Sequence, residues 1–156
     1  MVFSQQDIEA YIPQRRPFLF IDRILRFVPH QLLQASVQWG GDEAIFAGHF
    51  PGRPILPGVI LLEAMLQTAN FGLVKSHYGD LRPDPIPLVL VGMVKRLRFF
   101  SPVLPPVSVL ILARQHKVIK AGGIFSAVAS LNEAKVAEAE VYFSWSPTPS
   151  VSSSQA

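Results

Sequence analysis

The segment Val59–Val74 limits the fold of this chain more than any other part of the sequence. Over these residues, apolar side chains occupy nearly the whole circumference of a helix. A helix with so little polar surface is buried, so the rest of the chain must wrap around it. Its polar exceptions include Glu63, Gln67 and Asn70, whose spacing of i, i+4 and i+7 places them on one narrow stripe. Because buried polar groups need hydrogen-bond partners, we expect another segment to meet this stripe.

Most of the remaining chain predicts strands. Pro83, Pro85 and Pro87 end the helical part, and pairs typical of turns follow at Gly122-Gly123 and Asn132-Glu133. Strand-like residue patterns occur over 20–28, 33–39, 88–99, 107–115, 124–131 and 136–145. The sequence therefore predicts an α+β fold in which an antiparallel sheet wraps one long buried helix.

The two ends of the chain carry separate signals. Ser4 and Asp7 have the spacing of a capping box, which predicts a short helix that reaches Tyr11. Residues 146–156 are rich in Ser and Pro, so we expect a disordered tail after a single domain over residues 1–145. Met1–Ala10 lacks the basic start and apolar run of a signal peptide, which makes a cytoplasmic location the default expectation.

Composition argues against several kinds of site. The chain has no Cys, which rules out disulfides, thiolate metal sites and cysteine nucleophiles. No spacing of His, Asp and Glu suggests a metal site, and no Gly-x-Ser-x-Gly elbow suggests a serine hydrolase. The longest apolar stretches fall short of the roughly 18 residues that a membrane-spanning helix needs. We therefore expect neither a bound metal nor a membrane span.

Charge bears on the choice of partner. Only 16% of the 156 residues are charged, compared with about 25% in an average soluble protein, and burial between subunits would explain the difference. The net charge of +3 is modest, and no basic run or nucleic-acid recognition motif accompanies it. An acidic partner protein fits this charge at least as well as nucleic acid.

Two titratable residues are candidates for acid–base chemistry. His49 lies between Gly48 and Gly58, where glycines and prolines exclude a regular helix or strand and favour a stiff loop. Glu63 lies inside the apolar helix, where lost hydration raises the pKa of a carboxyl group and favours its proton-donating form. Structural roles stay open, since His49 can serve as a simple hydrogen-bonding group and Gln67 can satisfy backbone groups or position Glu63.

The start of the helix adds a third chemical element. Backbone N–H groups at Gly58 and Val59 have no partner inside the helix and lie at the positive end of its dipole. Groups of this kind stabilise negative charge that develops on a reacting oxygen.

A long motif carries a resemblance to a known family. It runs Gly48-His49-Phe50-Pro51-Gly52-Arg53-Pro54-Ile55-Leu56-Pro57-Gly58-Val59, continues as Leu62-Glu63-Ala64-Met65-Leu66-Gln67, and is preceded by residues 12–23, IPQRRPFLFIDR. With these residues the chain resembles the (3R)-hydroxyacyl-[acyl carrier protein] dehydratases of fatty-acid synthesis. The resemblance implies a hot-dog fold, with His49 as the catalytic histidine and Glu63 as the catalytic acid. No cofactor is expected.

The reaction of that family gives each group a role. A base removes the weakly acidic α-proton of a 3-hydroxyacyl thioester while an acid protonates the departing hydroxyl, and a trans-2-enoyl thioester remains. We expect Gly58, Val59, Gln67 and Phe50 to contact the substrate.

The resemblance also implies partners. These are an acyl carrier protein that bears the 3-hydroxyacyl group and a second copy of the chain, because the His and Glu of one site in this family come from different subunits of a homodimer. Lys95, Arg96 and Arg98 are the first candidates to bind the acidic carrier, with Arg53 a weaker one. Strand alternation predicts Arg96 and Arg98 on one face and Lys95 on the other. A simple solvated strand face is the alternative.

Several positions depart from the family pattern. Gln14 replaces a usual His, Arg16 replaces a usual Tyr, and Asn70 replaces a small residue. The turn at 101–107 lacks a usual Gly. The added Asn70 side chain would narrow or polarise the acyl tunnel, which leaves open whether the substrate belongs to ordinary fatty-acid synthesis or to a specialised acyl or polyketide-like pathway.

Two other functions fit the same fold. A hot-dog thioesterase directs a carboxylate at water, and a non-catalytic subunit binds the acyl carrier without turnover. The presence of both His49 and Glu63 in their motif favours the dehydratase over either alternative.

Overall fold

A computed structural model describes residues 2–120 and 122–146. The elements within these ranges are α1 Gln5–Glu9, β1 Arg23–Val28, β2 Leu32–Trp39, α2 Ala44–Gly48, α3 Gly58–Tyr78, β3 Leu88–Phe99, β4 Val107–Ile119, β5 Gly122–Leu131 and β6 Ala134–Ser146. Ser146 thus ends a strand, and the rest of the predicted tail, 147–156, lies outside the described residues.

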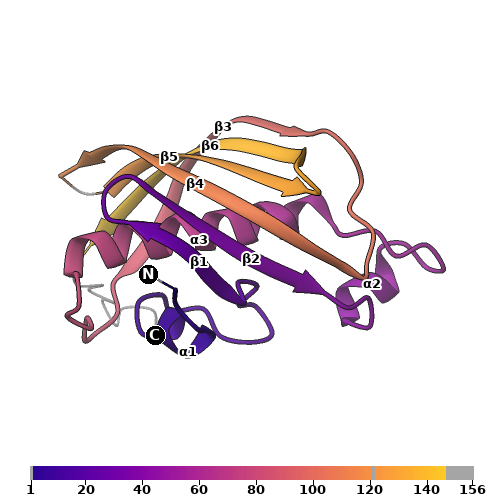
Figure 1. Ribbon diagram of the computed structural model, residues 1–156, viewed down its shortest axis with the longest axis horizontal. Coiled ribbons are helices and arrows are strands. Elements are labelled where there is room, and N and C mark those ends of the chain that lie inside the picture. Colours follow the sequence, from indigo (N-terminus) through magenta and orange to yellow (C-terminus); the bar gives the residue numbers. More distant parts are fainter. Residues whose placement is uncertain (1, 121, 147–156) are drawn as a thin grey trace, which may run out of the picture.

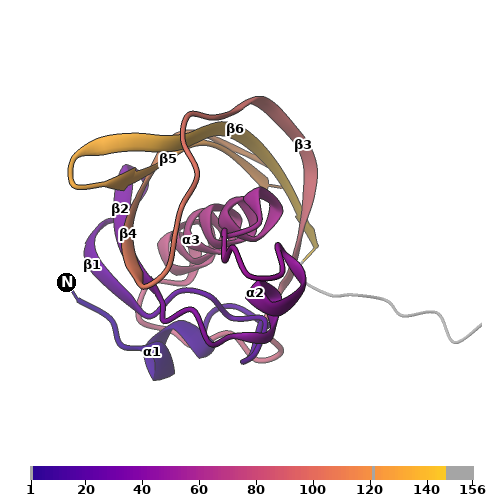
Figure 2. The same cartoon turned by 90° about the vertical axis from the view of Figure 1, so that its right-hand side faces the viewer.

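The strands form one sheet in the order β1-β2-β4-β5-β6-β3, and all neighbouring pairs are antiparallel. Figure 1 shows α3 lying along the length of this sheet, and Figure 2 shows the sheet curling around the helix. Alternate residues of the strands are buried toward the helix, among them Val37, Ile111 and Ala127. The predicted hot-dog fold is confirmed.

The central helix is longer than predicted at its carboxyl end. The apolar run ends at Val74, but α3 continues through the buried Lys75 to Tyr78. The Lys75 ammonium is fully paired, because Nζ donates to Tyr11 Oη at 2.9 Å, to the Gly79 carbonyl oxygen at 2.7 Å and to the Asp80 carboxylate at 3.1 Å. A lysine usually marks the exposed end of a buried helix. Here its charge is paired, so Lys75 is buried and the helix continues past it.

The amino-terminal segment agrees with its capping signal. Ser4 and Asp7 form the predicted capping box, although α1 ends at Glu9, two residues before Tyr11. The first strand begins later than predicted, at Arg23, because the Phe20 N–H donates to the Gln67 side chain at 2.9 Å instead of to a neighbouring strand.

The predicted turn at Gly122-Gly123 is wrong, because both residues lie in β5. A Cβ atom at Gly122 would lie 1.8 Å from the Phe143 carbonyl oxygen, so glycine is needed here for close strand contact and not for a turn. The turn at Asn132-Glu133 is confirmed, with positive φ angles of 46° and 69° that suit a tight hairpin between β5 and β6.

Candidate active site

The loop over residues 49–57 has neither helix nor strand, as predicted, and its backbone is well bonded. Phe50 and Arg53 exchange backbone hydrogen bonds of 3.1 Å and 2.9 Å, with Gly52 at φ 73° inside the turn. The Leu56 N–H donates to the Val103 carbonyl oxygen at 2.8 Å, which ties the loop to the rest of the fold. The residue that precedes this turn, His49, is therefore held on a fixed frame. The short helix α2 just before it was not predicted.

His49 is oriented by one hydrogen bond. Its Nδ1 lies 3.1 Å from the Ile55 carbonyl oxygen. A carbonyl oxygen only accepts, so Nδ1 carries the hydrogen and the neutral ring keeps its free electron pair on Nε2. The ring also stacks on Phe50, with 4.1 Å between the ring centroids. This arrangement presents Nε2 as a base.

A hollow of about 390 Å³ lies beside His49 and the start of α3. A Cβ atom on Gly58 would meet Phe99 Cζ at 2.9 Å, so glycine lets the aromatic ring lie against the first turn of the helix. Pro57 accepts the first hydrogen bonds of α3, from the N–H groups of Ile60 and Leu61. The N–H groups of Gly58 and Val59 precede these donors and have no carbonyl partner within the helix.

Glu63 is half-buried on α3, and its carboxylate is held by Gln67, whose Nε2 donates to Glu63 Oε1 at 2.9 Å. Burial raises the pKa of the Glu63 carboxyl above its ordinary value, and the hydrogen bond from Gln67 only partly opposes the shift. A carboxyl group with a raised pKa keeps its proton to higher pH and can act as an acid.

Gln67 has the hydrogen-bond partners in another segment that were predicted for the polar stripe of the helix. Its Oε1 accepts from the Phe20 N–H at 2.9 Å, and its Nε2 donates to the Phe18 carbonyl oxygen at 2.7 Å as well as to Glu63. The side chain is 1% exposed, so these bonds occur inside the protein. Gln67 both satisfies the backbone of residues 18–20 and positions Glu63.

A second, smaller hollow of about 160 Å³ lies beside Glu63. It is lined by Gln14, Glu63, Leu66, Gln67, Asn70, Val89, Leu90, Val91 and Phe143. His49 is not among these residues, and Glu63 does not line the hollow beside His49. The polar stripe predicted from the sequence, Glu63, Gln67 and Asn70, lines this hollow together. The contribution of β3 has no signal in the sequence, because it depends on tertiary contact.

The predicted alternation of the basic residues on β3 is wrong. Lys95 pairs with Glu140 and Arg98 with Glu138, so a bulge adds one residue to β3 between these positions. Arg96, within the bulge, has a φ of 52°, and its Nη1 lies 3.8 Å from Glu140 Oε2. Lys95 and Arg98 therefore share a face of the sheet. Arg96 lies close to Glu140, the residue that pairs with Lys95.

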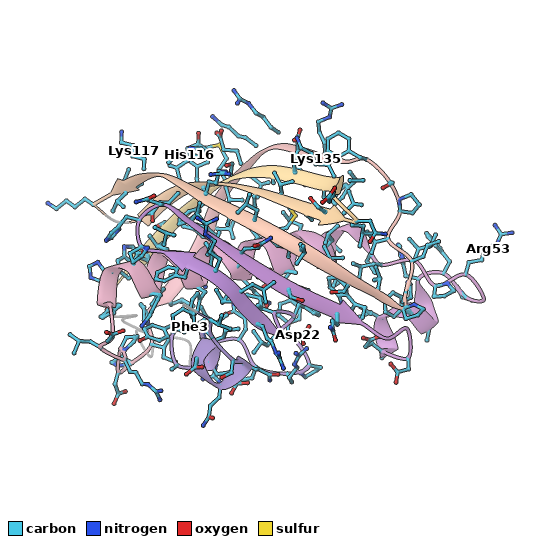
Figure 3. The ribbon with its side chains drawn as sticks, in the orientation of Figure 1. Phe3, Asp22, Arg53, His116, Lys117 and Lys135 are labelled. Carbon is cyan, nitrogen blue, oxygen red and sulfur yellow. The ribbon has the colours of Figure 1, made fainter. Side chains whose placement is uncertain are left out.

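The surroundings of this basic group include aromatic rings. Arg98 lies 5.1 Å from the centroid of Phe100, which also lines the hollow beside His49. Lys95 Nζ lies 5.2 Å from the centroid of Tyr142. Arg53 stands apart, at the tip of its loop in Figure 3.

The described residues offer neither a metal site nor a membrane-spanning helix. Within residues 2–120 and 122–146, no three His, Asp or Glu side chains are arranged to hold a metal ion. Among the helices of that same part of the chain, none is long and apolar enough to cross a membrane.

Comparison with known proteins gives a family match over most of the chain. The model of the FabA-like domain matches residues 12–140. A 3-hydroxyacyl-[acyl-carrier-protein] dehydratase FabZ of Latilactobacillus sakei is 35% identical over 142 residues, which cover 91% of this chain and 98% of that protein. The FabZ of Blochmanniella pennsylvanica is 34% identical over 140 residues, covering 90% and 91% of the two chains.

Solved structures agree on the fold. The dehydratase heterocomplex ApeI:P of Xenorhabdus doucetiae has a chain similar to this one with a TM-score of 0.71 and 12% identity, over 89% of this chain and 90% of that one. A hypothetical thioesterase of Streptococcus pneumoniae, solved with coenzyme A, gives a TM-score of 0.60 at 6% identity, over 79% and 84%. At such low identity the likeness concerns the fold alone.

Proposed function

This chain belongs to the FabA-like family of 3-hydroxyacyl-[acyl-carrier-protein] dehydratases, and from this premise we propose that it converts (3R)-hydroxyacyl groups on an acyl carrier protein into trans-2-enoyl thioesters. The observation that carries the proposal is the environment of Glu63. A half-buried carboxyl with a raised pKa, fixed by Gln67 beside a hollow, has the properties of a general acid.

The proposed reaction uses three groups of the chain. His49 Nε2 takes a proton from C2 of the thioester, and the N–H groups of Gly58 and Val59 stabilise the negative charge that develops on the carbonyl oxygen. Glu63 gives its proton to the hydroxyl on C3, the C3–O bond breaks, and water leaves as the C2–C3 double bond forms. Phe50, stacked on His49, and Gln67, bonded to Glu63, hold the two reacting side chains in place.

We place each complete site between two copies of the chain. Within one chain, His49 and Glu63 line different hollows. Strand β3 is an edge of the sheet, and several of its apolar side chains are exposed, namely Leu88, Leu90, Val91, Met93 and Leu97. A second copy that covers this edge would bury them and bring its own His49 toward Glu63.

The product decides between the three functions considered. Purified protein incubated with 3-hydroxyacyl-carrier thioesters of several chain lengths is expected to lose one water from the acyl group, as read by mass spectrometry. Release of a free acid would instead indicate a thioesterase. Binding of the carrier without either change would indicate a non-catalytic subunit.

We propose that the acidic carrier docks at the basic group Lys95, Arg96 and Arg98. The nearby carboxylates of Glu138 and Glu140 offset only part of this positive charge. Lys135, bonded to Glu138 at 2.7 Å, adds a fourth cation. Through the contact of Arg98 with Phe100, the group adjoins the hollow beside His49.

Charge reversal tests the docking surface. The double variant Arg96→Glu/Arg98→Glu is expected to raise KM for a carrier-bound substrate roughly tenfold, because it replaces attraction of the acidic carrier by repulsion. The effect should shrink as salt is added, since the Debye length is about 8 Å at physiological ionic strength. A small thioester without the carrier should be turned over as before.

The matched control is Arg26→Glu. Arg26 is an exposed residue on β1, the strand at the opposite edge of the sheet from β3, so reversing its charge should leave KM for the carrier-bound substrate unchanged. Equal loss on carrier-bound and small substrates would indicate damage to the fold, and no loss on either would place docking elsewhere.

A further inference from the structure

Two residues that line the hollow beside Glu63 each have a buried side-chain oxygen atom without a hydrogen-bond partner. Asn70 Oδ1 and Gln14 Oε1 are both inaccessible to solvent and, across the described part of the chain, accept no hydrogen bond. Asn70 is 3% exposed and lies on α3. Both residues line the same hollow as Glu63.

The other two polar side chains of this hollow, Glu63 and Gln67, are hydrogen-bonded to each other. The Gln67 amide bonds to the backbone of Phe18 and Phe20 and to Glu63, so it has little capacity left for Asn70 or Gln14. The other side chains of the lining are apolar. An unpaired buried carbonyl oxygen destabilises the folded chain, and an apolar residue at position 70 would suit a plain hydrocarbon ligand better.

Position and chemistry together specify what fits here. Asn70 lies seven residues after Glu63 on the same stripe of α3, which corresponds to about 10 Å along the helix axis. A ligand that reacts at Glu63 and continues along the helix would place a later part of its chain beside Asn70. Because a carbonyl oxygen accepts but does not donate, the matching ligand group is a hydrogen-bond donor.

We propose that Asn70, assisted by Gln14, makes this site select 3-hydroxyacyl chains that carry a second hydrogen-bond donor, such as a hydroxyl, several carbons beyond C3. The inference rests on the proposed dehydratase function and adds the class of acyl chain to it. A site with buried acceptors discriminates strongly against an analogue without the donor, because the acceptors then stay unpaired in the complex.

The test uses small 3-hydroxyacyl thioesters of one chain length, with a second hydroxyl moved carbon by carbon along the chain. For the unmodified protein, kcat/KM is expected to peak at one position and to exceed that of the plain chain at least about tenfold. Asn70→Leu, which replaces the amide with an apolar side chain of similar volume, should reverse this preference. Asn70→Ala should reduce the preference for the dihydroxylated chain. Because alanine is small, this variant excludes the explanation that the leucine side chain merely blocks the hollow.

Gln115→Leu is the matched control. Gln115 also has a buried unpaired amide atom, Nε2, but it lies on β4 and does not line the hollow beside Glu63. This variant should keep the preference for the dihydroxylated chain. A preference that changed equally in Asn70→Leu and Gln115→Leu would overturn the proposal.

The melting temperature of Asn70→Leu distinguishes a role of Asn70 in substrate selection from a role in a subunit contact. Asn70→Leu is expected to raise the melting temperature of the free protein by roughly 2–4 °C, because it removes an unpaired buried acceptor. A lowered melting temperature, or loss of self-association in light scattering, would show that Asn70 is paired within a subunit contact and would overturn the proposal.

Binding of the same thioesters to His49→Ala, measured by calorimetry, should show the same preference without turnover. If no thioester lost water but this preference persisted, the dehydratase proposal would fail and the selectivity proposal would stand. Equal binding of plain and hydroxylated chains would sink the selectivity proposal whatever the reaction.

Discussion

His49→Ala and Glu63→Gln are each expected to lower kcat for dehydration by about 10²–10⁴-fold, the usual contribution of a positioned general base or acid. His49→Ala removes the Nε2 atom that the bond from Nδ1 to Ile55 orients. Glu63→Gln keeps an oxygen for the bond from Gln67 but cannot supply the proton. Both losses should appear with carrier-bound and small substrates alike, measured by the absorbance of the enoyl thioester.

The pH dependence gives a second readout on Glu63. Because burial raises the pKa of this carboxyl, its protonated, proton-donating form persists to higher pH than that of an exposed glutamate. Activity should therefore fall as pH rises through this raised pKa, and Glu63→Gln should lack that decline in its residual rate.

His116→Ala serves as a control, because His116 is exposed and bonded to Ser126 away from both hollows. It should leave kcat unchanged. Near-full dehydration by folded His49→Ala or Glu63→Gln protein would contradict the assigned acid–base pair.

Local patterns predicted the elements that depend on local chemistry. The apolar run at 59–74 gave the central helix, and β3 has the predicted bounds Leu88–Phe99. The sequence predictions fail where the same residue type can occur in two different structural settings. Gly122 permits close strand contact instead of a turn, and Lys75 is buried because the distant Tyr11 hydroxyl is one of its hydrogen-bond partners. The bulge at Arg96 was also not predictable, because the alternation of residues along a strand assumes an unbroken strand and contains no sign of an inserted residue.

The candidate site was predictable only along the helix. The spacing of Glu63 and Gln67 predicts their contact, which the 2.9 Å hydrogen bond confirms. The partners of Gln67 at residues 18 and 20 are 49 and 47 residues away, so they depend on the folded topology. The same holds for the hollow that Glu63 shares with Asn70 and Gln14.

Mixing two inactive variants is expected to restore activity if the sites are composite. In a dimer of one His49→Ala chain and one Glu63→Gln chain, one site receives both intact residues and the other receives neither. Random exchange of equal amounts makes half of the dimers mixed, so about a quarter of the wild-type activity should return. The measurement is the dehydration rate as subunits exchange, with the mixed dimer followed by native mass spectrometry.

The matched control mixes His49→Ala with the double variant His49→Ala/Glu63→Gln. No site in that mixture contains an intact His49, so activity should stay at the level of the single variants even though the subunits exchange equally well. Recovery in the first mixture alone would place His49 and Glu63 of one site on different subunits, which agrees with their separate hollows in the single chain. Proven exchange without recovery in either mixture would mean that each site is built within one chain, and that the loop with His49 must move toward Glu63 on α3 to join the pair.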